Sequence, residues 1–229
     1  MGAAAAALVG AVALSGCGVT GTDIRPGVAA KVGDDSITVQ EVDETASGVC
    51  AYFKDDETDI PLAFYRSQIL QVLVREAATR QVVSDVGAKL AAGYDDAAKQ
   101  VVENYADLPA AQREAFVKID TAAAYIHYGE LAAALAVGES TGETAVSPQE
   151  ASEQGATLIQ EWLLGEDVEL NPMFGVVLGE DGALNGGDTS LSVAVSDEAV
   201  QAILPDDEDT EYVSKVAPLT ETLTDQQVC

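Results

Sequence analysis

The sequence predicts a mainly α-helical protein with small β elements, on three observations. Alanine supplies much of the 48% hydrophobic fraction, and alanine favours helix over sheet. Aromatic residues make up only 5% of the chain, so aliphatic side chains on helices must build the core. Apolar residues recur mostly every three or four positions from Leu62 to Val83, which is typical of an amphipathic helix. With 229 residues, the chain can form one sizeable domain or two small ones that share a core.

The chain carries a formal net charge of -28, from 39 acidic and 11 basic residues. A surface this negative repels nucleic acid and anionic lipid, so no nucleic-acid partner is expected. It favours cationic partners or metal counter-ions. The alternative interpretation is that the charge serves solvation alone.

The first 16 residues contain no charged side chain and are interpreted as a signal peptide. Their apolar run, Ala3 to Leu14, is too short to span a bilayer comfortably as a helix, but it suits the apolar region of such a peptide. No Lys or Arg precedes the run, as one would in most signal peptides. The alternative is a buried N-terminal core helix.

The apolar run closes with Leu14-Ser15-Gly16-Cys17, which resembles the lipobox of bacterial lipoproteins. A signal peptidase needs small residues before the cut, and the Cys17 thiol is the nucleophile that takes the lipid. The resemblance implies lipid attachment at Cys17 and anchoring on the outer face of the bacterial cytoplasmic membrane. Residues 17–27, rich in glycine and threonine, are then the lipidated tether.

A short hairpin and a capped helix are predicted next. Residues 28–33 and 36–37 read as strands on either side of an Asp34-Asp35 turn. Thr38 and Glu41 form a capping box, in which the Thr38 oxygen accepts from the Glu41 amide and the Glu41 side chain reaches back. The helix that starts there is expected to run past Cys50.

Further helices are predicted from apolar spacing and cap residues along the middle of the chain. A second capping box at Ser147 and Glu150, with Pro148 in the first turn, starts the last long helix. The predicted helices and linker are 61–83, 85–92, 95–105, 109 to about 136, the linker 139–147, and 148–165.

Beyond residue 165 the pattern changes from helical to strand-like. Glycine and aspartate dominate 179–190, which is predicted to be a loop. The remaining predicted elements are strands at 168–170, 174–178 and 191–195, a short helix at 196–204, and an acidic loop at 206–211.

The stretch Val28 to Asp43, VAAKVGDDSITVQEVD, resembles the N-terminal module of SurA-type chaperones, which the foldase PrsA and trigger factor share. The matching residues are Ala30, Val32, Gly33, Ile37, Thr38, Glu41, Val42 and Asp43. The resemblance implies a SurA-like helical module over residues 28–138, completed by a C-terminal α/β segment, 148–229, that packs back on it. It also implies binding of unfolded or exported polypeptides.

Many relatives carry a parvulin prolyl-isomerase domain after this module, and this chain departs from that pattern. The region after the linker is too short for such a domain, and the single histidine, His127, lies earlier on a predicted helix. Asn185-Gly186-Gly187-Asp188 matches a parvulin loop only faintly. We therefore expect a parvulin-lacking lipoprotein without isomerase activity, catalytic residues or cofactor.

Two cysteines, Cys50 and Cys229, remain after Cys17. Outside the membrane the environment is oxidising, and an even number of cysteines invites pairing. The alternative is two free or intermolecular thiols. Because SurA-type folds combine N- and C-terminal segments, the resemblance favours the Cys50–Cys229 disulfide.

A calcium site was weighed at Asp181, Asn185 and Asp188, since oxygen ligands on a glycine-rich loop suit calcium. Their spacing does not match an EF-hand, so a solvated turn is favoured and no metal site is expected. The acidic run at 206–209 is likewise read as a solvated loop.

Two functions remain open at this point. The first is a membrane-anchored, ATP-independent chaperone-like binder of exported polypeptides. The alternative is a structural or assembly lipoprotein that binds one dedicated envelope partner. With 2 Met and 4 Phe the chain has few of the adaptable side chains that promiscuous binders use, which is an argument against the first function. The resemblance and the expected location nevertheless make the chaperone-like binder the preferred interpretation.

Overall fold

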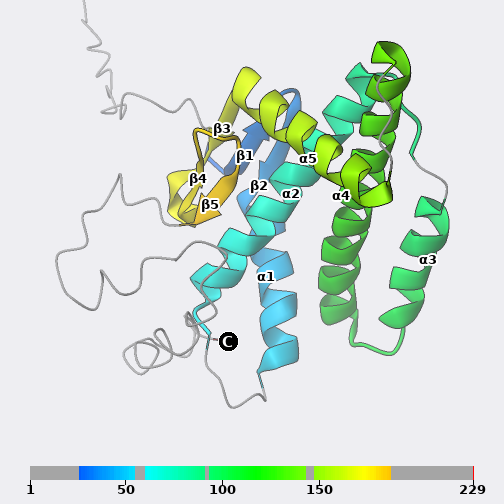
Figure 1. Ribbon diagram of the computed structural model, residues 1–229. Coiled ribbons are helices and arrows are strands. Elements are labelled where there is room, and N and C mark those ends of the chain that lie inside the picture. Colours follow the sequence, from blue (N-terminus) through cyan, green and yellow to red (C-terminus); the bar gives the residue numbers. More distant parts are fainter. Residues whose placement is uncertain (1–25, 55–59, 91–92, 143–146, 187–228) are drawn as a thin grey trace, which may run out of the picture.

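The computed structural model describes residues 26–54, 60–90, 93–142, 147–186 and 229. In these residues five helices make up most of the structure, and short antiparallel strands lie at one side (Figure 1). The predicted mainly α class with small β elements is therefore confirmed. The predicted signal peptide, the lipid-bearing Cys17 and the elements predicted between 191 and 211 lie outside the described residues.

A three-stranded antiparallel sheet joins the two ends of the described chain. Its order is β2-β1-β3, from β1 (Val28–Val32), β2 (Asp35–Thr38) and β3 (Val168–Leu170). The hairpin β1–β2 is local, as predicted, whereas β3 pairs with β1 from far along the chain. Asn171 extends the second pairing, because its backbone N–H donates to the carbonyl of Ala29 at 2.8 Å. The C-terminal segment thus closes on the N-terminal hairpin.

Helix α1 (Val39–Phe53) begins where the sequence predicts, because the Thr38 hydroxyl accepts from the Glu41 amide at 3.1 Å. The second half of the predicted capping box is different. The Glu41 carboxylate accepts a hydrogen bond from the ammonium of Lys118 on another helix instead of reaching back to Thr38. The buried residues of α1 recur every three or four positions and face the core, as a single amphipathic face requires: Val42, Thr45, Ala46 and Val49.

The core is built around α2 (Leu62–Asp85), which contacts α1, the two later long helices and strand β1. Figure 1 shows α2 crossing the middle of the molecule. Its aliphatic residues are almost completely withdrawn from solvent, and each buried Ile, Leu or Val side chain contributes roughly 1.5–3 kcal/mol. They are Ile69, Leu70, Leu73, Val74, Ala77, Ala78, Val82 and Val83.

Helices α4 (Ala110–Thr141) and α5 (Pro148–Gly165) pack closely because Gly155 has no side chain. A Cβ atom at Gly155 would collide with the backbone carbonyl of Glu130. The Glu130 side chain is buried, and Arg75 of α2 forms an ion pair with it at 2.7 Å. The Ser152 hydroxyl of α5 donates to the other carboxylate oxygen at 3.0 Å. The buried Glu130 carboxylate therefore links three helices. Arg75 compensates its charge, and Ser152 donates a hydrogen bond to it.

Helix α3 (Tyr94–Asn104) lies at the edge of the bundle and packs on α4 (Figure 1). It has no fully buried residue. Aromatic contacts attach it at both ends: Tyr94 packs edge-on against Tyr125, and Tyr105 stacks on Phe116. With so little buried apolar surface, α3 is expected to be the least stable helix of those described.

The predicted short helix 85–92 is wrong in the part that the structure describes. Helix α2 ends at Asp85, and Gly87 then takes a positive φ of 64° that a right-handed helix cannot accommodate. The Ala88 amide closes the turn by donating to the carbonyl of Val83 at 2.9 Å. Residues 88–90 are not helical.

Two other predicted boundaries are also corrected. Helix α4 continues to Thr141, so the first residues of the predicted linker 139–147 are helical, and Gly142 with positive φ ends the helix. The predicted loop 179–190 contains strand β5 (Leu184–Gly186), which pairs with β4 (Val176–Leu178) as an antiparallel hairpin. Phe174, predicted as extended, belongs to a 3₁₀ turn, Pro172–Phe174, that precedes β4.

Candidate binding groove

A groove of about 870 Å³ lies between α1 and the first half of α4. The two helices run close together there because Gly48 lacks a side chain. A Cβ atom at Gly48 would lie 2.5 Å from the carbonyl oxygen of Ala111 and 2.6 Å from the Cβ of Ala115. Small residues therefore form a shallow apolar floor. The lining comprises Thr38, Gln40, Glu41, Asp43, Glu44, Thr45, Ser47, Gly48, Ala111, Glu114, Ala115 and Lys118.

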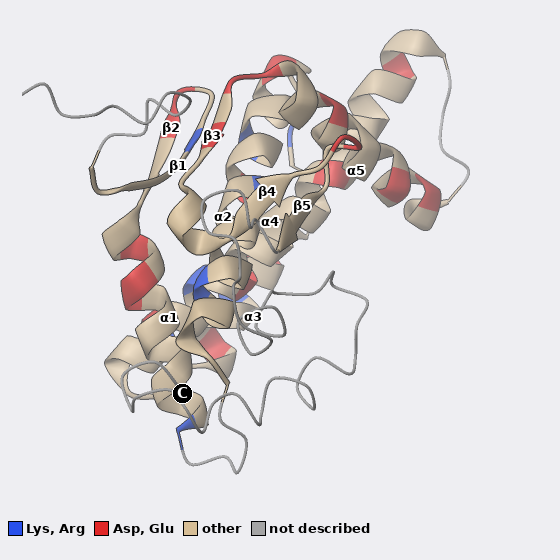
Figure 2. Cartoon of the chain, turned by 90° about the vertical axis from the view of Figure 1, so that its left-hand side faces the viewer, with Lys and Arg blue, Asp and Glu red and all other residues tan. Residues whose placement is uncertain are grey.

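The rim of the groove is acidic. Four carboxylates line it and Lys118 is its only cation. Lys118 bonds to Glu41 across the groove, and Asp43 is held from outside by Arg66 of α2 at 2.7 Å. The other two rim carboxylates, Glu44 and Glu114, form no ion pair among the described residues. Figure 2 shows acidic positions grouped along α1, with few basic ones beside them.

An aromatic cluster lies near the C-terminal end of α1, and none of its rings is among the residues that line the groove. Tyr52 lies one helical turn beyond Gly48 and packs edge-on against Phe116, with ring centroids 4.9 Å apart. Phe53 packs edge-on against Tyr52 and stacks on Tyr65 of α2. Tyr52 is 49% exposed although it is large, so its ring adds apolar surface outside the lining of the groove.

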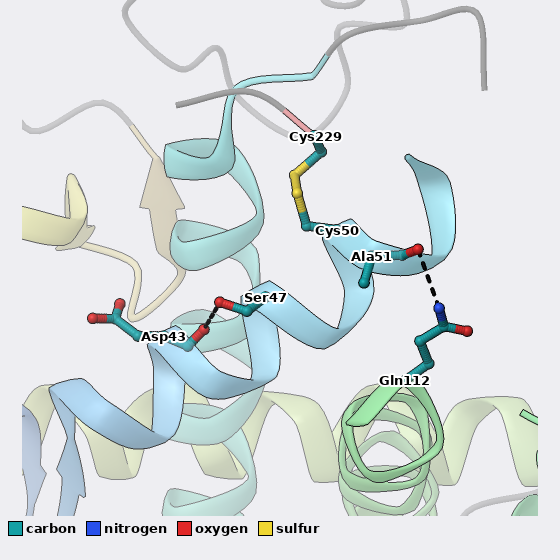
Figure 3. Close-up of a disulfide and its surroundings, with 6 residues drawn as sticks. All are labelled: Asp43, Ser47, Cys50, Ala51, Gln112 and Cys229. Atoms are coloured by element: carbon teal, nitrogen blue, oxygen red, sulfur yellow. Dashed lines mark hydrogen bonds between the residues drawn. A yellow bond between two sulfur atoms is a disulfide. The ribbon is translucent and has the colours of Figure 1, made fainter. Parts of the chain in front are cut away.

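A disulfide lies at the same end of α1 and ties the last residue of the chain to this helix. Cys50 and Cys229 are bonded, with their Cα atoms 4.8 Å apart and 179 positions between them (Figure 3). The Cys229 amide also donates to the carbonyl of Ile60 at 2.9 Å. Gln112 of α4 donates to the Ala51 carbonyl at 3.1 Å, which fixes α4 against the same turn of α1 (Figure 3).

The Tyr105 side chain links the end of α3 to α4 through a hydrogen bond, and the pKa of its phenol depends on that contact. Its phenol donates a hydrogen bond to the Asp120 carboxylate, and this bond, with burial and the nearby negative charge, raises the pKa of Tyr105 to about 12. The neutral phenol is thus the form that the folded protein stabilises.

We expect the Tyr105–Asp120 contact to be lost in alkali. Because the folded pKa, about 12, is above the ordinary value of 10.0, its contribution to stability is complete below pH 10 and falls as the pH rises to about 12. Tyr105→Phe should remove this part of the pH dependence. The check is to measure urea unfolding of both proteins across this range. If the free energy of unfolding depends on pH equally in both proteins, the raised pKa does not belong to Tyr105.

Of the other residues singled out from the sequence, those that the structure describes are not part of the lining of the groove. His127 is exposed on α4 and packs edge-on against Tyr128. The Asp181 carboxylate accepts from the Ala183 amide at 3.1 Å, and Asn185 donates to the Ala183 carbonyl at 3.4 Å, so both support the β4–β5 turn. Asp188 and the acidic run at 206–209 lie outside the described residues.

In the part of the chain that the structure describes, no group of three or more His, Cys, Asp or Glu side chains is arranged to hold a metal ion. None of the helices in the described ranges combines the length and apolarity needed to cross a bilayer.

Sequence reasoning missed the groove itself. Its floor depends on Gly48 meeting Ala111 and Ala115, and no local periodicity pairs α1 with α4. The available signal was the run of small residues, Ala46 to Gly48, on a helix that is otherwise amphipathic.

Comparisons with known proteins add no family. A scan against family models, a search of curated proteins and a search of solved structures each gave no match to this chain.

Proposed function

We propose that this protein is a chaperone-like binder that holds unfolded or exported polypeptides without ATP and without isomerase activity. The groove between α1 and α4 is the observation that carries the proposal. It is open to solvent and has an apolar floor of small residues beneath a polar rim. These are features that suit an extended or helical polypeptide segment rather than a compact small molecule.

The arrangement of elements supports the same proposal. Residues 28–43 form a hairpin followed by a capped helix, which is the order that the resemblance to the SurA-type module implies. The return of β3 onto β1 agrees with a module completed by the C-terminal segment. The proposal therefore takes this chain as a SurA-like module that lacks a parvulin domain.

An aggregation assay tests the proposal. Unfolded client proteins of different composition are diluted into buffer with and without the full chain, and light scattering is followed. We expect suppression for several unrelated clients at near-stoichiometric ratios, with no effect of added ATP. If every client aggregates as fast as in buffer, the chaperone proposal fails and a dedicated envelope partner becomes the better explanation.

The location is a separate proposal that rests on Leu14 to Cys17. We propose that the mature chain begins at a lipid-modified Cys17 on the outer face of the cytoplasmic membrane. Mass spectrometry of the membrane fraction should find an acylated Cys17 at the N-terminus, and Cys17→Ser should leave that fraction. Recovery of the unmodified chain from the cytoplasm would contradict this location.

A further inference from the structure

Some of the carboxylates at the rim of the groove have no cationic partner among the described residues. Glu41 and Asp43 are engaged by Lys118 and Arg66, so their charges are compensated locally. Glu44 accepts a hydrogen bond from Gln40 at 2.7 Å, but this neutral donor leaves its charge uncompensated. Glu114 is exposed and has no ion pair in the described ranges. Two uncompensated carboxylates thus face the groove from opposite helices, α1 and α4.

The charge of the groove excludes several occupants. Residues 187–228 of the same chain contain ten acidic residues and only one basic residue, Lys215, so the groove repels them. A second copy of the chain brings another net charge of -28. Nucleic acid and anionic lipid are repelled for the same reason. Charge complementarity leaves an occupant that is cationic.

The floor of the groove defines the rest of that occupant. The shallow surface of Gly48, Ala111 and Ala115 accepts small or aliphatic side chains and offers them no hydrogen bonds from side chains. A polypeptide that alternates apolar and basic residues satisfies both the floor and the rim.

We propose that the groove between α1 and α4 selects polypeptide segments that carry Lys or Arg beside apolar residues. This inference rests on the proposed function and gives it a client class. Recognition is by the two uncompensated carboxylates at the rim and by the apolar floor. The remaining surface charge attracts cationic segments from a distance but does not position them.

The test uses two labelled peptides of equal length with identical apolar residues, one with Lys and the other with Glu at the same positions. Binding to the full chain is followed by fluorescence anisotropy at low and at physiological ionic strength. The Lys peptide should bind at least roughly tenfold more tightly, and salt should weaken its binding. Equal affinities for the two peptides overturn the proposal.

A matched pair of variants separates the groove from the general negative surface. Glu44→Gln with Glu114→Gln removes two charges at the rim, and Glu161→Gln with Glu166→Gln removes two exposed charges at α5. We expect the rim variant to weaken binding of the Lys peptide roughly fivefold and the α5 variant to leave it within about twofold. If both variants weaken it equally, the groove is not the site. Thermal melts of both variants check that the fold is retained.

The outcomes also separate this inference from the proposed function. If the protein protects aggregating clients but binds both peptides equally, the charge preference is wrong and the chaperone function stands. If it neither protects clients nor binds either peptide, both proposals fail. Protection together with selective, rim-dependent binding of the Lys peptide supports both.

Discussion

Removal of the Cys50–Cys229 disulfide is expected to produce one of the largest losses of stability. The crosslink closes a loop of 179 positions, and the chain-entropy model assigns such a loop at most about 5 kcal/mol. For a domain of this size that corresponds to a fall in the melting temperature of about 10–20 °C. Residual structure in the unfolded chain makes the real fall smaller. Thermal melts followed by circular dichroism, with and without reductant, measure it.

The double variant Cys50→Ala with Cys229→Ala is the control for the reductant itself. It should melt at the temperature of the reduced protein and should not respond to reductant. Peptide mapping without reductant should recover the two cysteines in one crosslinked pair. If both thiols of the native, unreduced protein react with a maleimide, the link between the C-terminus and α1 does not exist.

The second large effect is expected where α5 crosses α4. Gly155→Ala places a methyl group against the backbone of Glu130, and neither backbone can move without disturbing the ion pair between Arg75 and the buried Glu130 carboxylate. We expect a loss of roughly 2–3 kcal/mol in the free energy of unfolding, as for other overpacked cores. Urea denaturation followed by circular dichroism provides the measurement.

Gly165→Ala at the end of the same helix is the matched control. A Cβ atom there meets nothing within 4 Å, so the same substitution costs no packing. The free energy of unfolding should stay constant or rise by up to about 1 kcal/mol, because alanine restricts the unfolded chain. If the two substitutions have equal effects, α4 and α5 are not in the close contact described.

The local elements of the fold were predictable from the sequence. The N-caps at Thr38 and Ser147 are side-chain hydrogen bonds to residues three positions away, so the sequence contains all of the information they require. The amphipathic repeat of α2 is likewise visible along the chain. The predicted end of α4 at about residue 136 is too early, because in the structure Gly138 is a buried position within the helix.

The groove and the helix contacts could not be predicted, because they depend on residues far apart in the sequence. The Glu41 side chain bonds to Lys118, which lies 77 positions away, and Arg75 pairs with Glu130 across 55 positions. Local capping rules predict that the Glu41 side chain bonds to Thr38, but tertiary packing brings the Lys118 ammonium to it instead. Nothing in the spacing of α1 indicates that α4 will cover it.

Hydrogen exchange of the full chain, alone and with an unfolded client, tests polypeptide binding in the groove most directly. Occupation of the groove opposes local opening of the helices that form it, so their amides should exchange more slowly. We predict slower exchange in α1 and over residues 110–118 of α4, with α5 unchanged. Slower exchange confined to α5 and the sheet, or identical exchange with and without the client, would contradict binding of polypeptides between α1 and α4.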